Sequence, residues 1–263
     1  EYVIKQIADL VSNYRVSHIQ IWDDLFVANK ERLREIVALF ECSSLKGSVK
    51  FNCQPRANLI NDEICELLKR MDCNIVLFGF ESGSDRILRY LKGDNVTVEQ
   101  NRNAIKICVK HGMRVQGSVI FGSPTETLED MQKTLDFIDF AHASGANRIW
   151  SFVMTPFPAT KMWEIAKEKN VVNDDMDWSL LTHNALDNPL LLDSSVNRDK
   201  FKKIFLQGKK KLNRFKWNKV ISFLKSNPIS AVTYFISLAF LYLKMQFLNI
   251  SKKSLRINEN ITH

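Results

Sequence analysis

Apolar and polar positions follow two different periods along the first two thirds of the chain. Residues 1–14 place apolar side chains at i, i+3, i+4, i+7 and i+8, which is the stripe of an amphipathic helix. Five short β-rich runs then occur at residues 18–22, 49–54, 75–80, 114–121 and 149–154. Each run precedes an amphipathic helical pattern. The sequence therefore predicts a repeated strand–helix unit.

Polar residues indicate where these helices begin. The expected cap residues are Asn29, Asn61, Thr97, Thr127 and Thr160. Thr97 with Gln100, and Thr127 with Asp130, have the spacing of a capping box. Because one helix lies between consecutive strands, the strands are expected to pair in parallel through right-handed crossovers.

This repeat predicts an α/β fold, either an open doubly wound sheet or a partial βα barrel. A complete eight-stranded barrel takes about 250 residues, and this pattern offers five strands. We expect one more strand upstream of Glu1. One row of strand positions is polar, and it comprises Gln20, Trp22, Asn52, Gln54, Arg56, Gln116 and Ser118. Such a row either lines a wet cavity or lies under the helices, with its members bonded to one another.

Composition narrows the class of protein. The 263 residues are 45% hydrophobic and 25% charged, which excludes a disordered or collagen-like chain. Residues 198–263 carry 15 Lys and Arg against 2 Asp and Glu, while the rest carries 22 against 27. This asymmetry disfavours nucleic-acid binding by the whole molecule. The cysteines are widely spaced and predict reduced core thiols of a cytoplasmic protein: Cys42, Cys53, Cys65, Cys73 and Cys108.

Two candidate sites contain acidic residues at strand ends. Asp23 and Asp24 follow the first strand, where they would hold a cation or a hydroxyl pair, or only cap a turn. Glu81 closes the third strand before Ser82 and Gly83. A carboxylate in that position can accept the two hydroxyls of a ribose. The alternative for Glu81 is a structural ion pair.

Two further candidates are turns. Gly122 and Pro124 shape the turn after the fourth strand, which is either part of a binding site or a well-capped turn. Thr155 and Pro156 leave the fifth strand as rigid extended backbone, suited to a flat heterocycle or to an irregular loop.

In order and spacing, the segments IQIWDDLFVANKER, FGFESGSDRIL, VIFGSPTETLED and TPFPATKMWEIA resemble the radical S-adenosylmethionine (SAM) enzymes. The likeness is greatest to the branch with a cobalamin-binding domain, and it covers residues 1–172. It implies a partial (β/α)6 TIM-like barrel. It also implies reductive cleavage of SAM to a 5′-deoxyadenosyl radical by a [4Fe–4S] cluster, or cobalamin-dependent methyl transfer.

The resemblance assigns roles to the candidate residues. Glu81 and Ser82 would lie at the SAM ribose, Asp23 and Asp24 near its methionine end, and Arg56 at a carboxylate of SAM or substrate. Gly122, Thr155 and Pro156 would flank the adenosine. SAM, the cluster and cobalamin are the implied cofactors, and the substrate and an external electron donor are the implied partners.

The chain departs from the family in two places. The three cysteines of the CxxxCxxC cluster motif are absent, so no metal ligand is assigned. Thr125 stands where a glycine is usual, and Ser123 where an aliphatic residue is usual. We therefore expect a C-terminal fragment of a radical SAM enzyme that is inactive by itself. The alternative is a non-catalytic, membrane-associated or scaffolding βα-barrel module.

Residues 173–263 are expected to form a basic and apolar helical extension. Eleven Lys and Arg accompany one acid in residues 198–225, and residues 228–243 lack charge. One interpretation is a helical hairpin packed on the barrel. The other is contact with a membrane surface through residues 198–250, which would place the protein at the periphery of a membrane.

Overall fold

The computed structural model describes residues 1–23, 26–182, 189–192, 196–227 and 232–233. They separate into two compact units, Glu1–Asn213 and Arg214–His263. The helices are α1 (Tyr2–Tyr14), α2 (Lys30–Glu41), α3 (Asp62–Arg70), α4 (Asp85–Lys92), α5 (Val98–Lys110), α6 (Leu128–Ala143), α7 (Lys161–Glu168) and α8 (Arg198–Ser226), with single 3₁₀ turns at Ala57–Leu59 and Trp178–Leu180. The strands are β1 (His18–Ile21), β2 (Lys50–Cys53), β3 (Cys73–Glu81), β4 (Arg114–Phe121) and β5 (Arg148–Val153).

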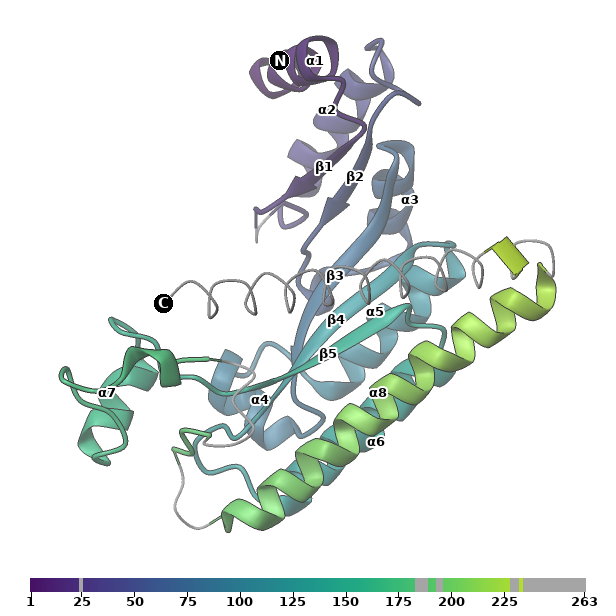
Figure 1. The fold of residues 1–263 in the computed structure, drawn as a ribbon. Helices are drawn as coiled ribbons and strands as arrows, with labels where there is room; N and C mark the ends of the chain where they lie inside the picture. The colour runs from purple at the N-terminus through teal and green to yellow at the C-terminus, as the bar shows by residue number, and fades with distance from the viewer. Residues whose placement is uncertain (24–25, 183–188, 193–195, 228–231, 234–263) are drawn as a thin grey trace, which may run out of the picture. The chain divides into compact units, whose positions relative to one another are not determined.

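All five strands form one parallel sheet in chain order, β1-β2-β3-β4-β5 (Figure 1). This confirms the predicted α/β fold with parallel strands and a helical extension. The order follows from the sequence, because each crossover helix returns the chain to the strand position beside the previous one. The sheet is open among the described residues, because β1 and β5 do not pair with each other.

The five predicted cap residues all begin helices. The side chains of Asn29, Asn61 and Thr160 accept backbone N–H groups of α2, α3 and α7. Thr97 and Thr127 form complete capping boxes at α5 and α6. The caps of α2, α3, α6 and α7 end strand-to-helix loops at the carboxyl edge of the sheet, whereas Thr97 ends the loop between α4 and α5.

The two faces of the sheet differ in burial. Alternate strand residues are fully buried, and they include Phe51, Phe80, Val115, Val119 and Phe121. The row that contains Asn52, Gln54, Gln116 and Ser118 is only half-buried. The helices therefore pack on the apolar row, and the polar row lines the open face. Of the predicted polar row, Gln54 and Arg56 line a cavity, and whether the whole row is wet stays a prediction.

Helix α8 completes the core of the first unit beside β4. Phe201 and Phe205 are fully buried, and the Phe205 ring meets that of Phe121 edge-on at 5.6 Å between centroids. Gly208 allows a close approach, since a Cβ there would lie 3.2 Å from a Leu135 methyl group. Most of the uncharged run after residue 227, including the predicted apolar contact segment, falls outside the described residues.

Candidate functional site

A cavity of about 690 Å³ opens at the carboxyl ends of β2 and β3. Parallel strands place all their carboxyl ends at one edge, which is where βα folds hold ligands. Strand residues, the loop after β2, α4 and α5 all contribute to its wall. Its polar and charged lining residues are Gln54, Arg56, Glu81, Lys92 and Asn101.

Glu81 is the last residue of β3 and has left-handed backbone geometry, with a φ of 59°. The ladder between β3 and β4 is irregular at this point, between Gly79 and Glu81. A non-glycine residue rarely adopts a positive φ, and such residues cluster at functional sites. The irregularity turns the Glu81 side chain toward the cavity.

Lys92, in the last turn of α4, holds the Glu81 carboxylate. The Lys92 Nζ lies 3.2 Å from Glu81 Oε1 and also donates to the carbonyl of Gly79. A Cβ at Gly79 would lie 2.3 Å from Glu81 Oε1, so only glycine leaves room for the carboxylate there. The side chain of Glu81 is 19% exposed, and the acid is therefore positioned but accessible.

Asn101 contributes an unused acceptor. Asn101 is fully buried, and its Nδ2 donates to the Phe80 carbonyl at 3.2 Å. Its Oδ1 has no hydrogen-bond partner among the described residues. A buried amide oxygen without a partner carries a free-energy cost that a ligand N–H or O–H would remove. Arg56, exposed at the start of the 3₁₀ turn Ala57–Leu59, adds a positive charge to the opposite wall.

Of the predicted site residues, Arg56 and Glu81 line this cavity. Ser82 is adjacent in sequence, but its buried hydroxyl bonds Thr134 Oγ1 at 3.2 Å instead. Asp23 forms an ion pair with Arg32 at 3.1 Å, and Asp24 lies outside the described residues.

The predicted residues after β4 and β5 lie at the same edge but do not line this cavity. Thr155 Oγ1 donates to the Val153 carbonyl at 3.2 Å, and Pro156 is buried. Gly122 has a φ of 86°, and its N–H bonds Glu126. Their proposed contacts with adenosine stay predictions.

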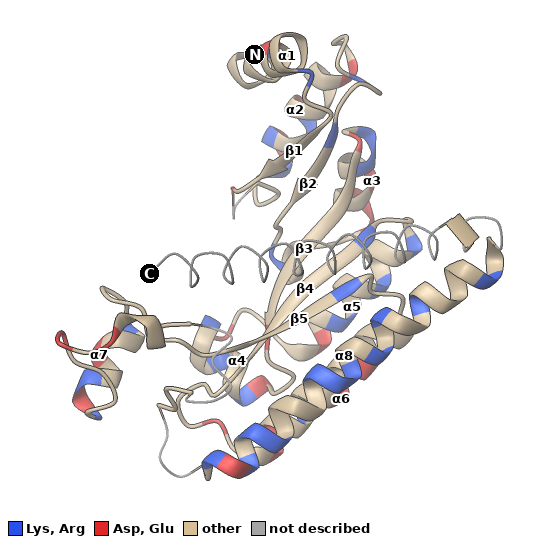
Figure 2. Cartoon of the chain, viewed as in Figure 1, with Lys and Arg blue, Asp and Glu red and all other residues tan. Residues whose placement is uncertain are grey.

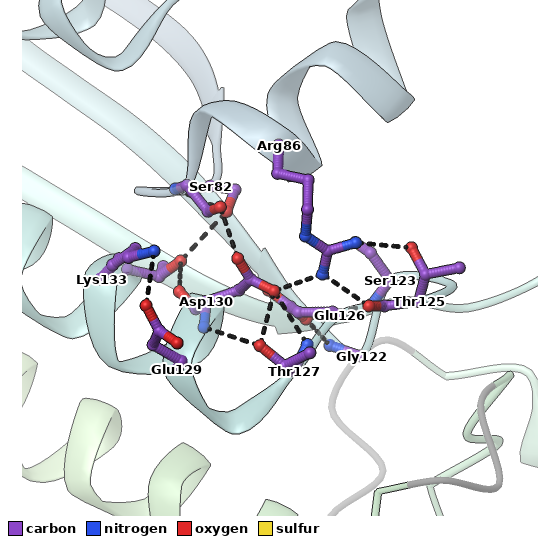
Figure 3. Close-up of polar contacts among 12 residues, drawn as sticks. Ser82, Arg86, Gly122, Ser123, Thr125, Glu126, Thr127, Glu129, Asp130 and Lys133 are labelled. Carbon is purple, nitrogen blue, oxygen red and sulfur yellow. Dashed lines mark hydrogen bonds and ion pairs between the residues drawn. The ribbon is translucent and has the colours of Figure 1, made fainter.

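A polar cluster ties the loop after β3 to the loop after β4 (Figure 3). Asp130 is its centre: it accepts from the Ser84 hydroxyl at 2.6 Å, from Arg86 and from Thr127. Burial alone would raise the pKa of Asp130, but hydrogen bonds from Arg86, Ser84 and Thr127 outweigh it and hold that pKa well below its usual range. The ionised acid therefore fixes both loops at the strand ends.

Arg86 also explains the departure at Thr125. Thr125 has a φ of 64°, the left-handed conformation that glycine adopts without cost. The Arg86 guanidinium donates to the Thr125 carbonyl at 2.6 Å and to its hydroxyl at 3.2 Å. These two bonds hold in place a conformation that threonine disfavours.

Glu126 is buried beneath the same loop. The N–H groups of Gly122 and Ser123 donate to its Oε2 at 2.6 and 3.1 Å, whereas Oε1 has no partner among the described residues. Burial raises the pKa of Glu126 to about 8 against the two backbone hydrogen bonds, which lower it. The acid is thus mostly neutral at pH 7.

Glu126→Gln should make the fold less sensitive to alkaline pH. The folded pKa lies above the unfolded value of 4.5, so the stability from the neutral acid is complete below about pH 4.5 and is lost as the pH rises to about 8. Glutamine stays neutral. Between pH 5.5 and 8.5, urea unfolding should show the wild type losing on the order of 3 kcal/mol relative to the variant.

Glu129→Gln provides the matched control, because Glu129 lies in the first turn of α6 with its side chain 78% exposed. The control should follow the wild type at both pH values. Equal pH dependence in Glu126→Gln and wild type would mean that Glu126 is ionised in the folded protein, contrary to this assignment.

The cysteines lie away from the cavity. Four are buried, as expected, whereas Cys42 is exposed, contrary to the core role predicted for it, because it is the C-cap of α2. The sulfurs of Cys53 and Cys73 are 3.6 Å apart, and their hydrogen bond together with burial raises the pKa of Cys53 well above its ordinary value. Within the described part of the chain, no group of His, Cys, Asp and Glu could hold a metal ion.

Sequence reasoning missed α4, Lys92, Asn101 and the cluster around Asp130. Ser84, Asp85 and Gly93 do flank α4 as helix-boundary signals, with Gly93 ending it at a φ of 74°. Asn101 offers no comparable signal, because an asparagine on a helix is ordinarily solvated.

The family model described as the Radical SAM superfamily matches residues 1–138 of this chain. An uncharacterized methyltransferase of Pyrococcus horikoshii is 32% identical over 69% of this chain and 38% of its own length. The bacteriochlorophyllide d C-8(2)-methyltransferase of Chlorobaculum tepidum is 26% identical over 83% of this chain and 46% of its own. The chain thus spans less than half the length of these curated relatives.

Solved structures share the fold. The radical S-adenosylmethionine methyltransferase TsrM from Kitasatospora setae, with cobalamin and a [4Fe–4S] cluster bound, has a TM-score of 0.56 and 20% identity. The superposition covers 77% of this chain and 40% of TsrM. The cobalamin-dependent enzyme OxsB with aqua-cobalamin bound has a TM-score of 0.50 and 16% identity, covering 65% of this chain and 32% of OxsB.

Proposed function

The chain belongs to the radical SAM superfamily, and from that premise we propose that residues 1–172 form the SAM-binding partial barrel of a methyltransferase. The cavity lined by Arg56, Glu81 and Asn101 carries this proposal. It lies at the carboxyl ends of parallel strands and combines a carboxylate, a guanidinium and an unpartnered amide oxygen. The names of the curated relatives support methyl transfer as the reaction class.

The cavity residues suit the functional groups of SAM. The Glu81 carboxylate can accept both hydroxyls of a ribose, and Lys92 keeps it in a single orientation. Asn101 Oδ1 supplies an acceptor to a ligand N–H or O–H. The Arg56 guanidinium matches the α-carboxylate of the methionine part. SAM would supply the methyl group or the radical that the reaction requires.

The support for the [4Fe–4S] cluster and for cobalamin differs from the support for SAM. The described residues provide no ligand set for a [4Fe–4S] cluster, so none of the steps proposed for this chain passes through one. We propose cobalamin for the intact protein because TsrM and OxsB are described with cobalamin bound. An external electron donor and an unidentified methyl acceptor complete the proposed system.

Glu81→Ala should weaken SAM binding about 10- to 100-fold, which corresponds to roughly 1.5–3 kcal/mol for a lost charged hydrogen-bonding partner. Calorimetric titration of the chain with SAM measures this effect. Alanine keeps the left-handed strain at position 81 that any non-glycine residue has, so the variant removes the carboxylate and its ion pair with Lys92 without relieving the backbone.

Adenosine and 2′,3′-dideoxyadenosine give the sharper comparison. The wild type should prefer adenosine, and Glu81→Ala should lose that preference while binding the dideoxy compound unchanged. Glu168→Ala, at the exposed end of α7, serves as the matched control and should behave as wild type. Unchanged SAM affinity in Glu81→Ala would remove Glu81 from the site. Absence of any SAM binding by the folded wild type would favour the non-catalytic scaffold instead.

A further inference from the structure

After its first turn, helix α8 carries positive charge without any negative charge (Figure 2). Residues 200–226 contain ten Lys and Arg and neither Asp nor Glu. In the first unit two of these lysines bind the barrel: Lys211 forms an ion pair with Asp139, and Lys209 Nζ donates to the Ser151 carbonyl at 3.1 Å. Packing on the barrel thus accounts for part of the positive charge before residue 214.

The second unit presents a separate apolar stripe on this helix. Trp217, Val220, Ile221 and Leu224 have the i, i+3, i+4, i+7 spacing of one helix face. Trp217 is 61% exposed and Ile221 is 47% exposed. Val220 and Leu224 are half-buried. Contiguous exposed apolar patches mark sites of interaction with proteins, membranes or ligands.

This stripe does not continue the one that packs on the barrel. At about 100° per residue, the face of Trp217 and Ile221 lies roughly half a turn around the helix from the face of Phe201 and Phe205. Both phenylalanines are fully buried in the first unit. The stripe from Trp217 to Leu224 is therefore a second apolar face of the same helix, distinct from the face of Phe201 and Phe205.

We propose that residues 214–226 bind an anionic lipid surface, with the apolar stripe inserted at the interface. Arg214, Lys216 and Lys225 are exposed around this stripe, and no acid interrupts the segment. An amphipathic helix with basic and large apolar residues is the type of element that lies in the plane of a membrane surface. The positive charge of the lysines and the arginine complements the negative charge of acidic lipid headgroups. Surfaces that bind single-stranded nucleic acid stack the bases on aromatic side chains, whereas this stripe is mostly aliphatic.

The sequence after α8 agrees with this partner. Residues 228–243 contain no charged residue, so the apolar character continues directly beyond the helix in the chain. No helix in the described part of the chain is long and apolar enough to cross a bilayer. The proposed contact is a surface association of this amphipathic helix.

Flotation of the full chain with vesicles tests the proposal. Vesicles of one part phosphatidylglycerol to three parts phosphatidylcholine should carry the protein, whereas pure phosphatidylcholine should bind at least tenfold less. Added salt should weaken the binding, since dissolved ions screen the attraction between the lysines and the acidic headgroups. Equal binding to both vesicle types, or to neither, would overturn the proposal.

Two double variants separate charge from insertion. Lys216→Glu with Lys225→Glu, and Trp217→Gln with Ile221→Gln, should each reduce vesicle binding at least tenfold. Lys5→Glu with Lys161→Glu makes the same change in net charge on other exposed positions and should bind as wild type. Circular dichroism and the unfolding midpoint should be unchanged in all three.

Two other occupants of the stripe would contradict the proposal. Single-stranded RNA that binds as tightly as the acidic vesicles, unaffected by Trp217→Gln with Ile221→Gln, would identify a nucleic-acid surface. A dimer in sedimentation that the same apolar variant dissociates, together with no vesicle binding, would identify a second copy of the chain as the partner.

Discussion

Replacing Gly83 by alanine is expected to cost the first unit on the order of 3 kcal/mol or more. A Cβ at this position would lie 2.2 Å from the carbonyl oxygen of Lys133 and 2.7 Å from the Cα of Thr134. Both are backbone atoms of α6, so no side chain can move aside. The loop would have to separate from α6, and the bond from the Gly83 N–H to Thr134 Oγ1 at 3.0 Å would be lost.

Urea unfolding of the variant measures this loss, and Gly47→Ala is its control. Gly47 has a φ of 78°, and no atom lies within 4 Å of the place that an alanine methyl group would take, so alanine there meets conformational strain without a collision. We expect about 1 kcal/mol for the control. A similar small loss at Gly83 would show that the loop after β3 is not held against α6 as described.

The chain by itself should acquire no [4Fe–4S] cluster after anaerobic reconstitution, and it should cleave no SAM. A cluster that is open to SAM at one iron needs three thiolates on one loop. Cys53, Cys73 and Cys108 are buried, and hydrogen bonding with a neighbouring thiol and burial raise the pKa of Cys53 and Cys108, which opposes thiolate formation.

Iron and sulfide analysis of the reconstituted protein provides the measurement. Cys42→Ser removes the exposed thiol and should abolish any iron bound adventitiously there. A stoichiometric, redox-active cluster in this variant that consumes SAM would contradict the expectation, and three of the buried cysteines would then have to converge. The prediction concerns this chain, whatever ligands the intact protein has.

The fold could be predicted from local signals because those signals repeat. Helices α2, α3, α5, α6 and α7 each begin at an Asn or Thr whose side chain accepts a backbone N–H. The chain order of the strands follows from short crossovers. Helix α4 was missed because it is one short helix directly before another. Its cap signals at Ser84 and Gly93 are weak without a longer apolar period.

The site was only partly predictable. Glu81 and Arg56 lie at or just after the ends of strands, which is where both the sequence motifs and the predicted fold placed a site. The roles of Lys92 and Asn101 depend on how α4 and α5 approach β3 in space, and no pattern along the sequence encodes that approach. The same holds for Ser82, whose hydroxyl meets Thr134 on α6. In each of these cases, the role of the residue depends on a contact with a residue far away in the sequence.

The contact between α8 and β4 affects how the protein folds during its synthesis. Each strand can pair with the previous one as soon as its crossover helix exists, because the sheet follows chain order. Phe121 is different, since Phe205, much later in the chain, covers its ring. A nascent chain that ends before α8 therefore exposes an aromatic patch beside β4. That patch is where we expect a chaperone to be needed for longest while the chain emerges from the ribosome.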